Sequence, residues 1–169
     1  MKLTKHLFTG AVALTGVALI GPAQAGTATG SLDVSATVEP LCLVSTTPVD
    51  FGIHTNSVNT AEGSIRVTCS PTVAYNIAMD GGLNVSNALE RRMGDGLGNL
   101  IIYGLHKIGT WNDFWGDQDF AATTKGTSIA GVGTGVDELR IVYGYSNYSF
   151  LPMQVPGFYQ DTVTVSVHY

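Results

Sequence analysis

The sequence predicts an all-β sandwich. Several short segments alternate apolar and polar residues, which is the period of two expected of strands with one buried face. Gly-, Pro- and Asp-containing turns separate these segments, and no segment shows a helical period. The clearest alternation closes the chain at residues 158–169 (FYQDTVTVSVHY), where Val163, Val165, Val167 and Tyr169 share one face. There are no internal repeats and no long linker, so one sandwich domain is expected.

The first 25 residues are expected to be a signal peptide. Lys2 and Lys5 supply a positive start, residues 7–20 form a short apolar run, and Ala23-Gln24-Ala25 is a small-x-small cleavage site. The apolar run is too short for a good membrane span. We therefore expect an exported, soluble chain that begins at Gly26.

An alternating strand is predicted immediately after the signal peptide, at residues 29–38 (TGSLDVSATV). Its apolar positions are Leu32, Val34, Ala36 and Val38. Because it precedes a full set of strand patterns, we interpret residues 26–40 as an extension and residues 41–169 as the domain. The alternation leaves two alternatives open: an ordinary first strand of its own domain, or a strand that completes the sheet of another copy.

The first half of the domain contains three further strand patterns. One strand begins at Cys42-Leu43-Val44, is interrupted at Thr46-Thr47-Pro48 and resumes over residues 49–53. Residues 56–63 are polar and are predicted to be a loop. Residues 64–70 and 73–79 alternate as strands, and Asp80-Gly81-Gly82 is a turn signal.

The second half is less regular. Residues 84–99 are rich in turn formers and receive no strand, whereas residues 100–105 (LIIYGL) are apolar on both faces, as in a central strand. Residues 123–135 are predicted to be a loop, residues 139–145 a strand and residues 146–156 a long connection. Six or seven strands are expected in total.

The two cysteines, Cys42 and Cys69, predict one structural disulfide in an oxidising compartment. The alternative, a redox pair, usually requires closer spacing. Without the signal peptide, six basic residues face 13 acidic ones, a net charge of −7. Such a sparse, acidic surface argues against nucleic acid or anionic membrane as a partner.

No enzyme signature is present, and we predict no catalytic residue, cofactor or metal site. The histidines His54, His106 and His168 are far apart, and a strand histidine is expected to be half-exposed. Asp113, Asp117 and Asp119 lack the spacing of a calcium loop, so they are predicted to be solvated loop carboxylates.

Two groups of aromatic residues could stack on sugars, but we expect them to close one end of the sandwich. The groups are Trp111, Phe114, Trp115 and Phe120, and Tyr143, Tyr145, Tyr148 and Phe150.

Several motifs occur in a specific order. The alternating strand precedes Cys42, Asp50-Phe51-Gly52 follows it, and Val67-Thr68-Cys69-Ser70 ends a later strand. Trp115-Gly116-Asp117 and a terminal G-x-Y-x-D-T-V-T-V-x-V-x-Y at residues 157–169 complete the set. In this order they resemble the spore coat protein U domain family, which includes subunits of archaic chaperone–usher pili. The resemblance covers essentially all of residues 26–169.

The resemblance implies an incomplete immunoglobulin-like sandwich that lacks its last strand. A periplasmic chaperone would fill the gap, and at an outer-membrane usher the N-terminal strand of the next subunit would replace it, a form of β-augmentation. It implies Leu32, Val34, Ala36 and Val38 as the inserted donor residues. The acceptor groove would include Val44, Val163, Val165 and Val167.

The resulting expectation is a non-enzymatic pilus subunit that supports adhesion or biofilm formation. It would pass through the periplasm to a surface fibre, with other pilin subunits, a chaperone and an usher as partners. The alternative is a self-complemented secreted or coat protein that could bind glycans through its aromatic side chains.

Overall fold

The computed structural model describes residues 21, 25–54, 57–146 and 154–169. The chain divides into two units, residues 1–37 and 38–169, which are described separately. The predicted signal peptide lies outside the described residues apart from Gly21 and Ala25. In the described part of the chain, no helix is long and apolar enough to cross a membrane.

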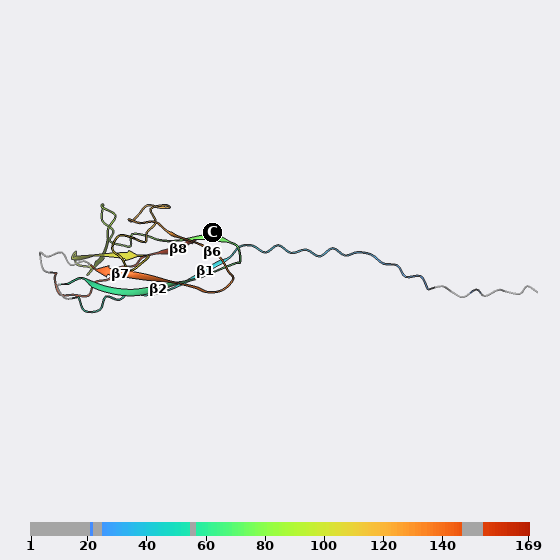
Figure 1. Cartoon of the computed structure of the whole chain (residues 1–169), viewed down its shortest axis with the longest axis horizontal. Coiled ribbons are helices and arrows are strands. Elements are labelled where there is room, and N and C mark those ends of the chain that lie inside the picture. The colour runs from blue at the N-terminus through green and yellow to red at the C-terminus, as the bar shows by residue number, and fades with distance from the viewer. Residues whose placement is uncertain (1–20, 22–24, 55–56, 147–153) are drawn as a thin grey trace, which may run out of the picture. The chain divides into compact units, whose positions relative to one another are not determined.

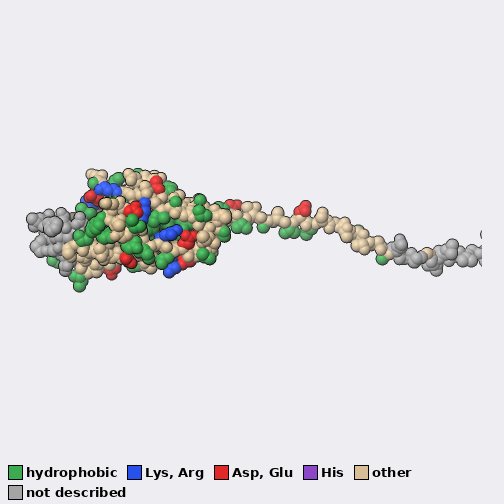
Figure 2. All heavy atoms as spheres, viewed as in Figure 1, with side chains coloured by type: hydrophobic (Ala, Val, Ile, Leu, Met, Phe, Trp, Pro, Cys, Tyr) green, Lys and Arg blue, Asp and Glu red, His purple; other side chains and the backbone are tan. Residues whose placement is uncertain are grey.

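Residues 25–41 form neither helix nor strand. The side chains of Leu32, Val34 and Val38 are 89%, 87% and 89% exposed. Figure 2 shows hydrophobic side chains of this segment on one side of its backbone and acidic side chains on the other. The alternation that the sequence predicts is therefore present as an exposed apolar row, and its role as a donor strand stays a prediction.

The second unit is all-β, as predicted. Its strands among the described residues are β1 Cys42–Thr47, β2 Asn59–Cys69, β3 Ala74–Met79, β4 Arg91–Gly94, β5 Leu100–His106, β6 Ile129–Val132, β7 Glu138–Ser146 and β8 Val165–His168. They form a five-stranded sheet in the order β1-β2-β7-β5-β4 and a three-stranded sheet in the order β6-β3-β8. Every pairing between these strands is antiparallel.

The two sheets pack face to face around one core. From the five-stranded sheet, β2 contributes Ile65 and Val67, and β5 contributes Ile101 and Leu105. Across from them lies β3, whose Ile77 is fully buried. In Figure 1 the long strands β2 and β7 lie side by side, with β6 and β8 of the other sheet across from them. This is the sandwich that the period-two pattern predicts.

The Cys42–Cys69 disulfide is present, as predicted. It joins the first residue of β1 to the last residue of β2, which lie directly opposite each other in the ladder with a Cα–Cα distance of 4.1 Å. Beside it, the backbone N–H of Ser70 donates to the carbonyl of Leu41 at 2.9 Å. The edge strand β1 is thereby held covalently and by hydrogen bonds at its start.

The prediction of a loop over residues 56–63 was wrong, because β2 already begins at Asn59. Asn59 lies opposite Ser146 and Gly63 opposite Val142, so β7 satisfies the backbone of this polar stretch. The predicted interruption at residues 46–48 was also wrong. The strand continues through Thr47 and ends before Pro48, which has no N–H to donate.

Residues 49–53 form no strand, contrary to prediction. Instead, Val49 and Phe51 pack against the core. A Cβ at Gly144 would lie 2.5 Å from Val49 Cγ1, and one at Gly63 would lie 2.7 Å from Val49 Cγ2. These two glycines therefore let the segment after β1 approach the inner face of β2 and β7 closely.

Two strands lie where none was predicted. β6 falls inside the expected loop over residues 123–135, and β4 falls inside residues 84–99. β6 is formed by pairing with β3, and β4 by pairing with β5, so distant partners stabilise sequences with weak strand patterns. The connection predicted for residues 146–156 lies largely outside the described residues.

The last segment of the chain changes sheets. Gln160 exchanges backbone hydrogen bonds with Gly94 of β4 at 2.9 and 3.0 Å, on the five-stranded sheet. Five residues later, Val165 pairs with Met79 of β3, on the three-stranded sheet. The predicted strand over residues 158–169 was therefore too long, because only β8 forms a regular ladder in this segment.

Candidate functional site

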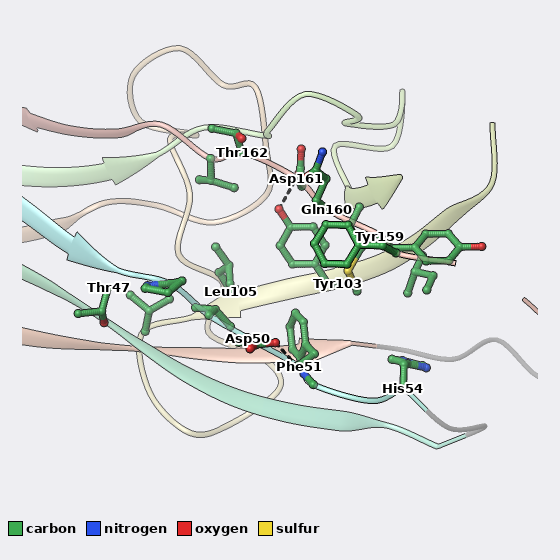
Figure 3. Close-up of a pocket in the computed structure, with 18 of the residues that line it drawn as sticks. Thr47, Asp50, Phe51, His54, Tyr103, Leu105, Tyr159, Gln160, Asp161 and Thr162 are labelled. Carbon is green, nitrogen blue, oxygen red and sulfur yellow. Dashed lines mark hydrogen bonds between the residues drawn. The ribbon is translucent and has the colours of Figure 1, made fainter. Parts of the chain in front are cut away.

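A groove of about 980 Å³ enters the sandwich between two non-strand segments. Residues 46–54, at and after the end of β1, form one wall, and residues 154–163, before β8, form the other. In Figure 3, Phe51 and His54 lie on one side and Tyr159 and Asp161 on the other, with Tyr103 between them. Protein interiors rarely leave such a volume unfilled, so the groove is a candidate binding site.

The floor of the groove is apolar. Buried side chains from both sheets line it: Ile65, Met79, Met93, Ile101, Leu105 and Val142. Partly buried Val163 and Val165 line it from the C-terminal segment. A row of apolar side chains could occupy this surface with a large favourable change in hydration.

Asp161 attaches the C-terminal wall to the floor. Its Oδ2 accepts a hydrogen bond from Tyr103 Oη at 2.6 Å, and its Oδ1 accepts one from the backbone N–H of Leu83 at 2.8 Å. A Cβ at Gly82 would lie 2.1 Å from Asp161 Oδ2, and the φ of Gly82 is +74°, so glycine is required there. Burial raises the pKa of Tyr103, and the hydrogen bond to Asp161 raises it further, which keeps the hydroxyl a donor.

The turn after β3 holds the same wall a few residues further on. Asp80 Oδ1 accepts hydrogen bonds from the backbone N–H of Thr164 at 2.8 Å and of Gly82 at 3.0 Å. The backbone N–H of Asp80 donates to the carbonyl of Thr164 at 3.1 Å. The predicted Asp-Gly-Gly turn thus positions the entry to β8.

Arg91 is a structural residue that the sequence analysis did not identify. Its side chain is buried and donates to the carbonyls of Met79, Asp80 and Trp115 at 2.8, 2.7 and 2.9 Å. Burial lowers the pKa of Arg91, and Tyr103 and nearby carboxylates oppose that shift. The only sequence signal was a pair of arginines in a turn-rich stretch.

Of the four predicted acceptor residues, Val44 lies on β1, Val165 and Val167 lie on β8, and Val163 lies in the segment before β8. Val163 and Val165 line the groove. Val167 packs against the core further along β8, and Val44 is 45% exposed on β1. Val49, Phe51 and Tyr159 also line the groove. For Val49 and Phe51, the sequence signal was the alternation of apolar residues over residues 49–53.

The histidines do not converge. His54 lines the groove, and His168 stacks on Phe120 with ring centroids 3.9 Å apart. His106 is 1% exposed, so the prediction of a half-exposed strand histidine was wrong for this residue. It is buried because Phe114 and Tyr145 cover it, with ring centroids 4.5 and 5.0 Å away.

Asp117 is also buried, so the prediction of solvated carboxylates was wrong for it. Its oxygens accept hydrogen bonds from the backbone N–H groups of Thr123 and Thr124 and from the Thr123 hydroxyl, which organise the loop. Asp113 lies 3.6 Å from Lys107 Nζ, and Asp119 accepts a hydrogen bond from Ser128. Among the described residues, no group of three or more His, Cys, Asp and Glu side chains could hold a metal ion.

Only one of the first four aromatic residues is buried in the sandwich. Trp115 is fully buried, and its Nε1 donates to the Ile77 carbonyl at 2.8 Å. The prediction that these aromatic residues close one end of the sandwich was wrong for Trp111, Phe114 and Phe120, whose side chains are 49%, 37% and 42% exposed. Tyr143 and Tyr145 are half-buried, and the remaining two candidates, Tyr148 and Phe150, lie outside the described residues.

These features define a class: a two-sheet antiparallel sandwich with an apolar groove beside its last strand. The sequence model of the spore coat protein U domain matches residues 28–166. The chain therefore belongs to the spore coat protein U domain family. A search of curated protein sequences gave no significant match.

The fold is shared with a solved structure described as the CsuC–CsuE chaperone–tip adhesion subunit pre-assembly complex from archaic chaperone–usher Csu pili of Acinetobacter baumannii. The TM-score is 0.59 at 23% sequence identity. The match covers 79% of this chain and 40% of the other, so this chain spans less than half the length of that relative.

Proposed function

We propose that this chain is a structural subunit of a surface pilus, assembled by donor-strand complementation. The observation that carries the proposal is the open, apolar-floored groove of about 980 Å³. Residues 29–38 of another copy are its proposed occupant. The family match and the fold shared with a chaperone–usher pilus subunit support this assignment.

The dimensions of the donor segment suit this role. Ten extended residues span roughly 33 Å, about the length of a sandwich. Burial of Leu32, Val34, Ala36 and Val38 would contribute of order 5–8 kcal/mol, as an upper bound, before any ladder hydrogen bonds form. In the structure the three larger of these side chains are almost fully exposed, so nearly all of this gain is available on insertion.

The sheet edges can also accept a strand. β8 ends the order β6-β3-β8, and β1 ends the order β1-β2-β7-β5-β4, so each has one pairing edge without a partner among the described strands. An inserted strand beside β8 would complete its ladder, as in other cases of β-augmentation. Until then the unpaired edge and apolar groove invite aggregation, which explains a need for a periplasmic chaperone.

The proposed route follows from these parts. A signal peptide over residues 1–25 exports the chain, a chaperone protects the groove in the periplasm, and an outer-membrane usher exchanges the chaperone for the next subunit. The resulting fibre supports adhesion or biofilm formation. The solved relative is itself a chaperone complex, which supports the chaperone as a partner.

The test is a pair of matched double variants in the donor segment. Val34→Arg with Val38→Arg charges the apolar face, whereas Asp33→Arg with Thr37→Arg adds the same two arginines to the polar face. We expect the first pair to abolish fibres and the second to retain them, with chaperone binding preserved in both. Fibres are scored by electron microscopy and chaperone binding by co-purification.

Normal polymerisation of the Val34→Arg and Val38→Arg variant would contradict the proposal. So would a purified chain whose groove takes up no added peptide of residues 29–38, which is the behaviour of a self-complemented coat protein.

A further inference from the structure

A second cavity, of about 160 Å³, lies on the outer face of the five-stranded sheet. Successive residues of β5 point to opposite faces. Ile101 and Leu105 line only the groove, and Ile102, Gly104 and His106 line only this second cavity, whereas Tyr103 lines both. The two cavities therefore lie mainly on opposite sides of one strand, and Tyr103 borders both of them.

Aromatic rings form much of its wall. Trp111 packs on Tyr145 with ring centroids 4.5 Å apart, and His106 packs on Phe114 at the same distance. A Cβ at Gly104 would lie 2.7 Å from His106 Nε2 and 3.1 Å from Phe114 Cε1. The absence of a side chain at Gly104 thus permits the close packing of these rings over the strand.

One residue of this lining, His106, carries a buried nitrogen for which the described part of the chain provides no hydrogen-bond partner. His106 is 1% exposed, and its Nδ1 has no hydrogen-bond partner among the described residues. A buried nitrogen in this state loses its hydration without compensation, which favours a ligand or water that can bond to it. Burial lowers the pKa of His106, so the neutral ring offers one donor and one acceptor nitrogen at neutral pH.

Charged groups are also part of the lining and are held by a fixed loop. Lys125 Nζ lies 3.2 Å from Glu90 Oε1, and both side chains remain partly exposed. The carbonyl of Leu89 accepts hydrogen bonds from the Thr124 hydroxyl at 3.0 Å and from the backbone N–H of Lys125 at 3.2 Å. These contacts join the loop before β4 to the loop before β6, so the polar groups are positioned in advance.

We propose that this cavity binds a single neutral pyranose ring, alone or as the terminal residue of a glycan. An aromatic side chain can pack against the apolar C–H face of a sugar. Its hydroxyls both donate and accept, so they can satisfy an imidazole nitrogen, a carboxylate and an ammonium group together. The cavity is well below the roughly 300–1,000 Å³ of sites for drug-sized ligands, which limits it to one ring.

Other ligand classes fit less well. A cationic ligand would meet Lys125 and the buried Arg91 in the lining. An anionic ligand would find both cations already bound, because Lys125 pairs with Glu90 and Arg91 donates to three backbone carbonyls. A purely aromatic ligand would leave the His106 nitrogen and the rim charges without new partners. A neutral, ring-shaped polyol satisfies both the apolar and the polar parts of the lining.

The two tryptophans provide a direct assay. Trp111 is 49% exposed and lines the cavity, whereas Trp115 is fully buried elsewhere. The full chain, exported and purified, would be titrated with the methyl glycosides of glucose, galactose, mannose and N-acetylglucosamine. We expect at least one to change the tryptophan emission and to give a saturation-transfer NMR signal. In Trp111→Phe the change in emission should disappear.

A matched pair of variants locates the site. Trp111→Ala should weaken binding at least tenfold by NMR titration. Phe120→Ala removes an aromatic ring of similar exposure that stacks on His168 and does not line the cavity, so it should change affinity less than twofold. The emission of Trp115 in Trp111→Ala verifies that the variant is folded.

Three results would overturn the proposal: no binding of any of the four glycosides, binding unaffected by Trp111→Ala in folded protein, or binding restricted to charged sugars. None of them bears on strand exchange, because the polymerisation test above concerns the donor segment and the groove.

Discussion

The hydrogen bond from Tyr103 to Asp161 should be a main attachment of the groove wall. Tyr103→Phe removes one hydroxyl and leaves the ring in the core. The bond is short, 2.6 Å between Oη and Oδ2, and its acceptor is a carboxylate. Hydrogen bonds to charged groups typically contribute about 1.5–3 kcal/mol, and Tyr103 is only 8% exposed, so little water can replace the lost partner. We expect a loss of about 1.5–3 kcal/mol in the free energy of unfolding.

The assay is urea unfolding of the purified chain, with Asp161→Asn and the double variant completing a cycle. The asparagine Oδ1 can still accept the hydrogen bond from Leu83 N, but Nδ2 then replaces Oδ2, so Asp161→Asn removes the acceptor of the Tyr103 hydroxyl. Because both single variants weaken the same contact, their effects should not add, and a coupling energy of about 1 kcal/mol or more is expected. Additive effects, or a Tyr103→Phe loss below about 0.5 kcal/mol, would refute the reasoning.

Alkaline unfolding checks the same contact independently. The pKa of Tyr103 is raised in the folded state, chiefly by burial, so above about pH 10 the unfolded chain loses this proton first. Stability from this group is present below that pH and is lost as pH rises through the folded-state pKa. Tyr103→Phe should therefore have a shallower alkaline decline than the natural chain.

Three further outcomes are expected. Replacing Cys42 and Cys69 together by Ala should lower the free energy of unfolding by about 3–4 kcal/mol, measured by urea unfolding without reductant. The disulfide closes a loop with a sequence separation of 27, and its loss lets the unfolded chain gain conformational entropy. An unchanged unfolding midpoint would contradict this reasoning. Trp115→Ala should cost about 3–5 kcal/mol in the same assay, because the ring is fully buried, and a loss under 1 kcal/mol would show that the core refills the space. Burial lowers the pKa of His106 in the folded state, and Asp113 opposes that shift. As pH falls, the unfolded chain therefore takes up this proton first, so the free energy of unfolding should fall below about pH 6.5. His106→Gln should flatten that decline when unfolding is measured across acid pH.

Local sequence patterns were sufficient to predict a strand where that strand has one clearly buried face. In β2, Ile65, Val67 and Cys69 are buried as their alternation predicts, and the facing cysteines form the expected bridge. Local patterns did not predict the strands that form only because a neighbouring strand pairs with them. Residues 59–63 are polar, yet they form a strand because β7 lies beside them in register.

The residues of the candidate site also differ in whether a local sequence pattern could identify them. The terminal alternation predicted that Val163 and Val165 share one face, and both side chains line the groove. No local pattern predicted Asp161 and Arg91, because their roles depend on partners far along the chain: Tyr103 for the carboxylate, and the carbonyls of Met79 and Trp115 for the guanidinium. No local period encodes such contacts.

The sequence by itself determined the all-β class, the disulfide and the apolar row of the N-terminal segment, because each follows from residue type and short-range spacing. Only the tertiary structure decided where the groove opens. The chain crosses from the five-stranded sheet at Gln160 to the three-stranded sheet at Val165, and the segment after β1 packs over Gly63 and Gly144. Both features arise from long-range packing and hydrogen bonding, since Gln160 lies 66 residues after Gly94 and Gly144 lies 95 residues after Val49.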